Sequence, residues 1–232
     1  MHVPDGFLDA PTSLATGVVA VAGIGLALWR SRSAAADPIA PLAGLVATFV
    51  MAAQMLNFPV GAGTSGHLLG GALAAVLIGP WLATLAISVV LLVQAVAFAD
   101  GGLTALGTNV TLMALVGVWT GWAIFAAIRS VLPKRLAMVP IAAAIAAWFS
   151  VLFAALTFVG LYAIGGQAPI ALDTLTTGML GVHALIGLGE AAITFLIVSA
   201  VITARPDLVY GAGPARAVEA KRRAQQIQGA LA

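Results

Sequence analysis

The sequence contains no cysteine and very little charge, and both absences restrict what the protein can be. Without cysteine there are no disulfides and no thiolate ligands for a metal ion. Only 8% of the 232 residues are charged, against about 25% in an ordinary soluble domain. Since 62% of the residues are hydrophobic and the mean hydropathy is +1.10, we expect a polytopic membrane protein rather than a soluble enzyme.

Two further absences concern motifs. The start, MHVPDGFLD, has neither a basic region nor an early apolar run, so it is not expected to be a cleaved signal peptide. The glycine-rich stretch 61–66 is not followed by lysine, which excludes a phosphate-binding loop there. We find no ATP-binding motif, and the length suits one compact helical domain.

Apolar segments predict an all-α membrane bundle of about seven transmembrane helices, each needing about 20 apolar residues. The uncharged run 66–99 is too long for one crossing, and we expect a break at Gly79-Pro80, because proline removes a hydrogen-bond donor and clashes with the preceding turn. The predicted helices cover residues 12–29, 39–57, 67–79, 81–98, 104–128, 136–163 and 180–203.

The basic residues test this count. With seven crossings they all fall on one side of the membrane, which the positive-inside rule makes the cytoplasm. They are Arg30, Arg32, Arg129, Lys134, Arg135, Arg205, Arg216, Lys221, Arg222 and Arg223. The N-terminus is then outside and the C-terminus is in the cytoplasm. Three histidines, His2, His67 and His183, fall near the outer boundary.

We expect two parts, a transmembrane domain over residues 1–204 and a cytoplasmic tail over residues 205–232. The tail is rich in alanine and charge from Ala215 to Ala232. This composition is compatible with a surface helix that docks a partner and equally with a solvated end.

The residues Met1-His2 are the first candidate metal ligands. A free terminal amine, the next amide nitrogen and the His2 imidazole can close two fused chelate rings on one cation. Nitrogen-rich planar coordination favours late divalent metals such as Ni(II), Cu(II) or Co(II). All these groups must lose protons to bind, so binding should weaken as pH falls. The turn and the apolar Phe7-Leu8 that follow suit a segment that folds back as a plug.

His67 is the second candidate, because the glycines before it allow backbone to approach a ligand closely. A helix-end histidine bonded to carbonyls is the alternative. Polar residues nearby are candidates to orient the ligating groups. They are Gln54, Asn57, Thr64 and Ser65.

His183 and Glu190 lie seven residues apart on one helix face, and ionisable groups within a span are functional candidates. His183 is either a gate or third imidazole or a residue that only bonds to a loop, and we favour the latter. Glu190 is either functional or a hydrogen-bonded packing residue. Asp100 and Asn109 either line the site or satisfy loop backbone, and we favour the structural role.

Three segments carry a resemblance to a known family. MHVPDGFLD, NFPVGAGTSGHLLGGALAAVLIGPW and QAVAFADGGLTALGTN resemble the substrate-binding subunits, or S components, of cobalt and nickel energy-coupling factor transporters. The resemblance implies that Met1, through its amine, His2 and His67 coordinate Co(II) or Ni(II) as the transported substrate. It implies a transmembrane coupling subunit, cytoplasmic ATPase subunits and often a small accessory membrane subunit as partners in the lipid bilayer, and no nucleic acid.

Two other functions compete with metal capture. An intramembrane metalloenzyme would use His67, His183 and Glu190, but the chain has no HExxH spacing. A structural membrane scaffold would explain the hydrophobicity but not the three histidines near one boundary. We therefore predict a transport subunit and not an enzyme.

Overall fold

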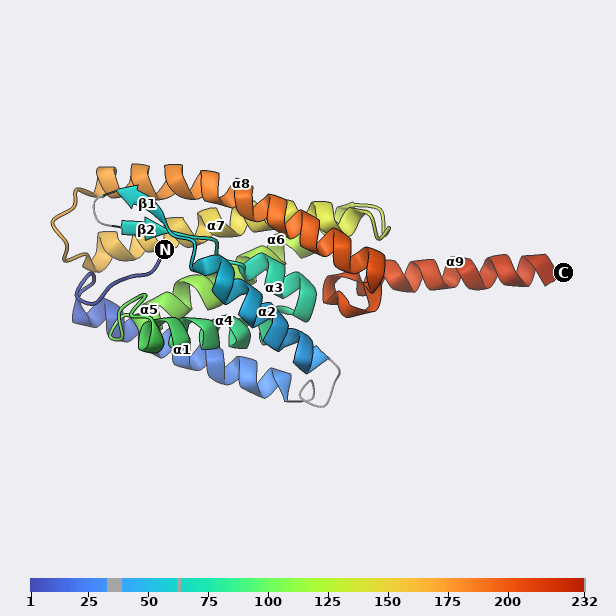
Figure 1. The fold of residues 1–232 in the computed structure, drawn as a ribbon, viewed down its shortest axis with the longest axis horizontal. Helices are drawn as coiled ribbons and strands as arrows, with labels where there is room; N and C mark the ends of the chain where they lie inside the picture. Colours follow the sequence, from blue (N-terminus) through green and yellow to red (C-terminus); the bar gives the residue numbers. More distant parts are fainter. Residues whose placement is uncertain (33–38, 62–63, 232) are drawn as a thin grey trace.

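The computed structural model describes residues 1–32, 39–61 and 64–231, with the side chains of a few flanking residues, Thr64 among them, outside the description. The chain folds into a bundle of helices with one small hairpin (Figure 1). The helices are α1 (Ala10–Ser31), α2 (Ile39–Gln54), α3 (Gly71–Ile78), α4 (Pro80–Ala97), α5 (Leu106–Asn109), the π-helical η2 (Val110–Gly117), α6 (Val118–Val131), α7 (Met138–Gly165), α8 (Leu172–Ala204), the short turns η3 (Pro206–Leu208) and η4 (Tyr210–Ala212), and α9 (Gly213–Leu231). The strands are β1 (Phe58–Gly61) and β2 (Thr64–Gly66).

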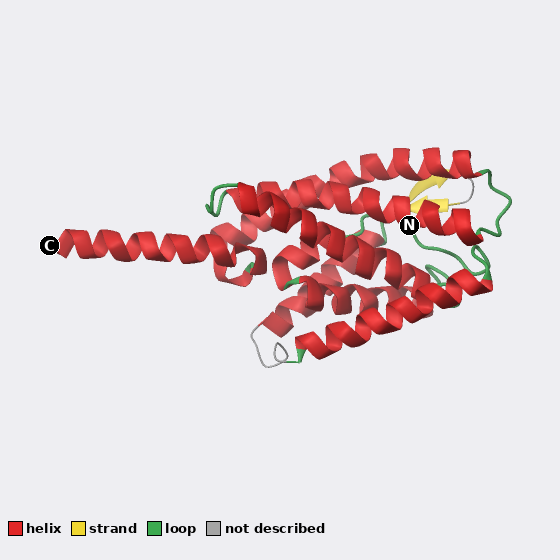
Figure 2. Cartoon of the chain, turned by 180° about the vertical axis from the view of Figure 1, so that it is seen from behind, coloured by secondary structure: helices red, strands yellow, loops and turns green. Residues whose placement is uncertain are grey.

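Among the described residues, five helical segments are long and apolar enough to cross a membrane: Ala10–Ser31, Pro80–Ala97, Leu106–Val131, Met138–Gly165 and Leu172–Ala204. A sixth apolar helix, Pro41–Gln54, is shorter. With eight residues, α3 is only about 12 Å long and cannot cross by itself. The all-helical membrane bundle is therefore confirmed (Figure 2), whereas the count of seven crossings stays a prediction.

The predicted break at Gly79-Pro80 is confirmed. Gly79 has a φ of +82°, and α4 begins with Pro80. The N–H group of the first residue of a helix has no partner within the helix, so proline, which lacks this group, loses no hydrogen bond there. Several boundaries differ from the prediction by about three residues, as where α2 ends at Gln54, and two helix starts differ by more. The helix expected from residue 67 begins at Gly71, because residues 67–70 form no regular structure and Gly70 has a left-handed backbone with a φ of +74°. The helix expected from residue 180 begins at Leu172, where its first turns cover the hairpin beside Val60.

The predicted loop before His67 is a hairpin. β1 and β2 pair antiparallel, with Phe58 opposite Gly66 and Pro59 opposite Ser65. Strands this short carry too few residues for an alternating pattern of apolar side chains, so the sequence does not predict them. Their pairing satisfies backbone groups that would otherwise lack hydrogen bonds beside the bundle.

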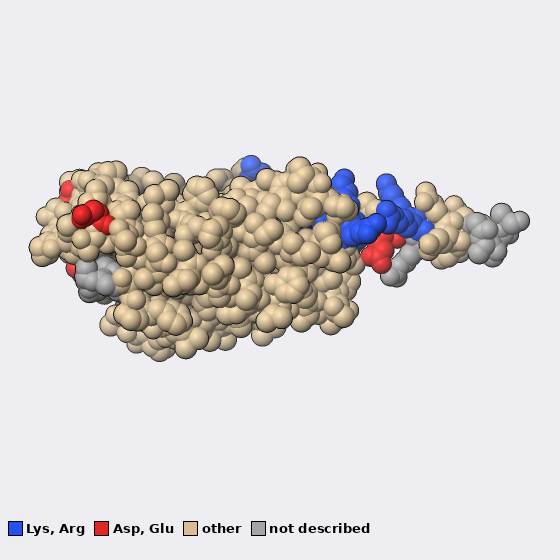
Figure 3. All heavy atoms as spheres, turned by 90° about the horizontal axis from the view of Figure 1, so that it is seen from above, with Lys and Arg blue, Asp and Glu red and all other residues tan. Residues whose placement is uncertain are grey.

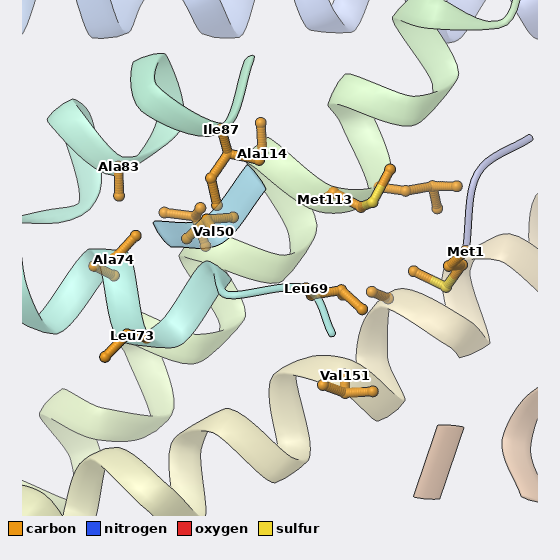
Figure 4. Close-up of a cluster of buried hydrophobic side chains, with 14 of the residues drawn as sticks. Met1, Val50, Leu69, Leu73, Ala74, Ala83, Ile87, Met113, Ala114 and Val151 are labelled. Carbon is orange, nitrogen blue, oxygen red and sulfur yellow. The ribbon is translucent and has the colours of Figure 1, made fainter. Parts of the chain in front are cut away.

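The short helix α3 forms the centre of the core. All eight of its residues are buried. Leu73 and Ala74 share an apolar cluster with Val50 and Ile87 of the flanking helices (Figure 4). Helix α6 approaches α3 so closely that a Cβ on Gly121 would lie 2.7 Å from the Cβ of Ala72. Small residues at the crossing make this approach possible.

Charges separate toward the two ends of the bundle. The N-terminus, the hairpin and the connections 98–105 and 166–171 lie at one end, and α9 projects from the other (Figure 1). On the face drawn in Figure 3, acidic groups lie at the first end, and most basic groups gather at the second end beside a smaller acidic cluster, with largely uncharged surface between the ends. This is the separation expected for a membrane protein, and the orientation itself stays a prediction.

Candidate metal centre

The N-terminal segment folds back into the bundle, as predicted. Met1 and Val3 are buried, and the Met1 side chain enters the same apolar cluster as Leu69 (Figure 4). Asn109 pairs with both backbone groups of Val3, accepting from its N–H at 2.7 Å and donating to its carbonyl at 3.1 Å. The carbonyl also accepts from the Gly102 N–H at 3.0 Å. Met1 and His2 are thus placed by hydrogen bonds from α5 and from the connection after α4.

The predicted turn and anchors hold the other end of the segment. Gly6 has a φ of +74°, and Phe7 and Leu8 are buried. The Phe7 ring packs on Phe158 and Tyr162 of α7, with centroids 5.5 and 5.1 Å apart. The chain is therefore fixed on both sides of the turn.

Both ring nitrogens of His2 face oxygen atoms. Its Nδ1 lies 3.1 Å from Oδ1 of Asp100, and its Nε2 lies 3.2 Å from Oε1 of Gln94. The hydrogen bond from His2 is the largest effect that lowers the pKa of Asp100, and a hydrogen bond from Asn57 acts in the same direction. A negative charge is thus held beside His2.

His67 has one nitrogen engaged and one unused. Its Nδ1 lies 2.8 Å from the Leu68 carbonyl, so this nitrogen carries the proton and donates it. Its Nε2 is fully buried and has no hydrogen-bond partner among the described residues. An imidazole whose tautomer is fixed in this way presents a lone pair suited to a metal ion.

The two candidate histidines lie face to face. Their ring centroids are 4.5 Å apart with an interplanar angle of 29°. Burial lowers the pKa of the Met1 amino group to about 4, against a smaller opposite effect of Asp100. Burial is also the largest cause that lowers the pKa of His67 well below its usual range. The amine and His67 therefore both offer neutral nitrogen at pH 7.

The segment that carries His67 is clamped by two helices. Glu190 of α8 is buried, and its two carboxylate oxygens accept from the N–H groups of Leu69 at 2.6 Å and Gly70 at 3.0 Å. Gln54 of α2 donates to the Leu69 carbonyl at 2.8 Å. With both oxygens engaged, Glu190 is occupied in holding backbone, which does not support a role as the base of a metalloenzyme.

His183 lies beside the hairpin. Its Nδ1 is 2.8 Å from the Met179 carbonyl, and its buried Nε2 has no partner among the described residues. A Cβ on Gly66 would lie 3.1 Å from the His183 ring. The structure thus brings a third imidazole next to the residue that precedes His67, and its role as a gate stays a prediction.

The remaining predicted residues fall into different places. Asn57 joins the site through Asp100. Ser65 lies in β2, and none of the hydrogen bonds of the described residues joins it to a histidine. Thr64 begins β2, and its side chain lies outside the described part of the chain. Sequence analysis missed Gln94, although a lone amide in an otherwise apolar span was a usable signal.

The arrangement offers nitrogen more than carboxylate. Within the described residues, no group of three or more His, Cys, Asp or Glu side chains is placed to hold a metal ion. A centre here needs the amino and amide nitrogens beside His2 in addition to imidazole. Such a donor set suits nickel, cobalt or copper better than magnesium or calcium.

Comparisons with known proteins agree with this chemistry. Residues 2–208 match the family model CbiM, described as a cobalt uptake substrate-specific transmembrane region. A protein of Haloquadratum walsbyi, provisionally named a metal transport protein, is 40% identical over 210 residues, which cover 90% of this chain and 94% of that one. A protein of Archaeoglobus fulgidus, provisionally named a fused nickel transport protein NikMN, is 41% identical over 214 residues, covering 90% and 68%.

The chain is also similar to a protein named for cobalt transport and to a transporter of known structure. The cobalt transport protein CbiM of Sorangium cellulosum is 41% identical over 131 residues, which cover 54% of this chain and 57% of that one. The crystal structure of a transition metal transporter superposes with a TM-score of 0.78 at 27% identity, covering 88% of this chain and 93% of that one.

Proposed function

This chain belongs to the CbiM family of cobalt and nickel transport proteins and is a multi-pass protein of the cell membrane. On that premise, we propose that it is the substrate-binding subunit of an energy-coupling factor transporter. It captures Co(II) or Ni(II) from outside and is not itself an enzyme. Its proposed partners are a transmembrane coupling subunit, cytoplasmic ATPase subunits and a small accessory membrane subunit. These supply the ATP-driven step of import.

The metal ligands we propose are the Met1 amine, the amide nitrogen and imidazole of His2, and the Nε2 of His67. The observation that carries this assignment is the buried, unpartnered Nε2 of His67 beside the ring of His2. If the Nδ1 of His2 is a ligand, its contact with the Asp100 carboxylate must be replaced by a bond to the metal ion. The carboxylate then stays close enough to balance the charge of the bound metal.

The proposed path follows from the position of the site. Residues 1–204 form the proposed transmembrane domain, and the N-terminal plug and the hairpin close its outer end. His183, which lies beside Gly66, is the proposed gate. Asn57, Thr64 and Ser65 are the proposed supporting groups. Release toward the cytoplasm accompanies movement against the coupling subunit, and residues 205–232 form the proposed cytoplasmic tail.

The direct test measures metal binding by the purified full chain with Met1 at its start. We expect His2→Ala and His67→Ala each to abolish high-affinity Ni(II) and Co(II) binding in calorimetry while thermal unfolding in detergent stays cooperative. An added residue before Met1 should have the same effect, since it removes the chelating amine and leaves every side chain in place. Unchanged affinity in both histidine variants would refute the site.

A further inference from the structure

A second cavity lies at the opposite end of the bundle from the histidines. It measures about 430 Å³ and lies between the last turns of α6 and the elbow formed by η4 and the first residues of α9. The residues that matter for its chemistry are Trp122, Phe125, Arg129, Ser130, Lys134 and Tyr210. Nothing in the proposed metal capture uses this pocket.

The walls of the pocket are aromatic and fixed in place. Trp122 packs on Phe125 and on Tyr210, with centroid distances of 5.5 and 5.4 Å. Tyr210 is held because its ring covers Gly79, where a Cβ would approach it to 3.3 Å. The next residue, Gly211, lies so close to Phe125 that a Cβ would come within 2.8 Å of its ring. The elbow therefore forms a permanent wall of the pocket.

Two cations lie at the pocket without acidic partners. Arg129 ends the span Leu106–Val131, and its Nη1 donates to the Pro133 carbonyl at 3.0 Å. Lys134 follows on the exposed connection. Ion pairs in the described part of the chain include His2 with Asp100 and Arg205 with Asp207, and none there joins Arg129 or Lys134 to a carboxylate. Neither Arg129 nor Lys134 thus has a carboxylate partner within the described chain, and both positive charges are available to an anion.

The order of charged and aromatic residues along the pocket indicates which class of ligand it fits. Trp122 and Arg129 lie seven residues apart on α6, which puts them on one face about 10 Å apart along the axis. The pocket thus runs from cations at the end of a membrane-spanning helix to aromatic rings deeper along the same helix. A soluble phosphate would use only the first part, whereas a phospholipid uses both. Trp and Tyr also prefer this level of a bilayer.

We propose that this pocket binds an anionic phospholipid, with its phosphate between Arg129 and Lys134 and an acyl chain against Trp122 and Phe125. The bound lipid joins α6 to the elbow that leads into α9. Each basic residue near an anionic lipid surface contributes about a fivefold preference, so two predict a preference on the order of tenfold or more.

The test titrates the full-length protein in detergent with phosphatidylglycerol or with phosphatidylcholine of the same acyl chains, and counts bound lipid by native mass spectrometry. Phosphatidylglycerol should bind at least about tenfold more tightly. The double variant R129Q/K134Q should lose this preference. The matched control K221Q/R222Q removes two cations from α9 at the same end of the molecule and should keep it.

Three results would overturn the proposal. The first is an undiminished preference for phosphatidylglycerol in R129Q/K134Q. The second is an equal loss of that preference in K221Q/R222Q, which would indicate diffuse charge attraction. The third is equally tight binding of soluble glycerol phosphate, which would indicate a site for the headgroup alone. If the double variant does not fold, K134Q alone changes only an exposed side chain and should lower the preference several-fold. An unchanged preference in that variant would equally contradict the site.

Discussion

At the scale of single residues, the position of His2 depends on a glycine in the connection after α4. Gly101 has a φ of +91°, and a Cβ there would lie 3.0 Å from Nδ2 of Asn109 and 3.1 Å from Cδ2 of His2. Any side chain at this position would press on the histidine and on the amide that holds Val3. Gly6 shares the backbone feature, with a φ of +74°, but has open space around it.

This pair of glycines gives a matched prediction. Gly101→Ala and Gly6→Ala both introduce backbone strain of about 1–3 kcal/mol, so both should lower the unfolding temperature. Only Gly101→Ala displaces His2, and we expect its Ni(II) affinity to fall about tenfold or more. Calorimetric titration of both variants checks this. Equal losses of affinity would show that the contact with His2 is not what matters.

Glu190 gives a second prediction at this scale. Glu190→Ala leaves the N–H groups of Leu69 and Gly70 buried without an acceptor, at about 1–3 kcal/mol for each group. We expect lower thermal stability and, since His67 precedes this segment directly, metal affinity reduced about tenfold. Glu190→Gln keeps one acceptor oxygen and should recover part of both losses. An alanine variant that binds metal like the unaltered protein would show that the clamp does not position His67.

Sequence reasoning found some members of the site and missed the contacts between them. His2 and His67 are predictable because histidine is rare here and each lies beside a turn or glycines. For Glu190 a hydrogen-bonded packing role was one of the two alternatives, but its partners, the N–H groups of Leu69 and Gly70, were not predictable, because these bonds span 121 and 120 residues of sequence. Asp100 and Gln94 contact His2 only because the last turn of α4 and the connection after it face the N-terminus in space, which no local spacing encodes.

At the scale of elements, the crossing of α3 and α6 determines whether the central short helix stays in place. Gly121→Ala would bring a Cβ to 2.7 Å from the Cβ of Ala72 and 2.9 Å from its Cα. Overpacking of this kind costs about 1–3 kcal/mol. Gly160 of α7 has no neighbour within 4 Å, and its change to alanine should be neutral or slightly stabilising, since alanine favours helix.

The measurement is thermal unfolding of the two variants in the same detergent. We expect Gly121→Ala to unfold several degrees below the unaltered protein and Gly160→Ala to unfold at or above it. If the two variants behave alike, α3 is free to move aside, and close packing at this crossing does not hold it.

Elements were predictable where a local signal marks them. The Gly79-Pro80 break is such a signal, because proline cannot continue the ladder of the preceding helix. The hairpin of β1 and β2 has no such signal, since its strands of four and three residues are too short for an alternating pattern. The start of α8 at Leu172 also escaped detection, because threonine and glycine in its first turns weaken helix propensity while packing against the hairpin and α7 favours it.

At the scale of the whole molecule, the separation of charge gives the bundle two chemically different ends. The end with the histidines carries Asp5, Asp9, Asp100 and Asp173, and the other end carries the lysines and arginines together with Asp207 and Glu219. Burying either set of charges in hydrocarbon would be costly, so the bundle can enter a membrane only with its axis across it. The basic end then determines which way it faces.

The absence of cysteine makes this orientation directly measurable, because a single introduced thiol has no background. Gln167 and Ala137 are both exposed, on the connections at the histidine end and at the basic end. We expect a membrane-impermeant maleimide to label Gln167→Cys in intact cells and Ala137→Cys only after the cells are permeabilised. The opposite pattern would place the histidines in the cytoplasm, and a subunit built that way could not capture its ion from outside.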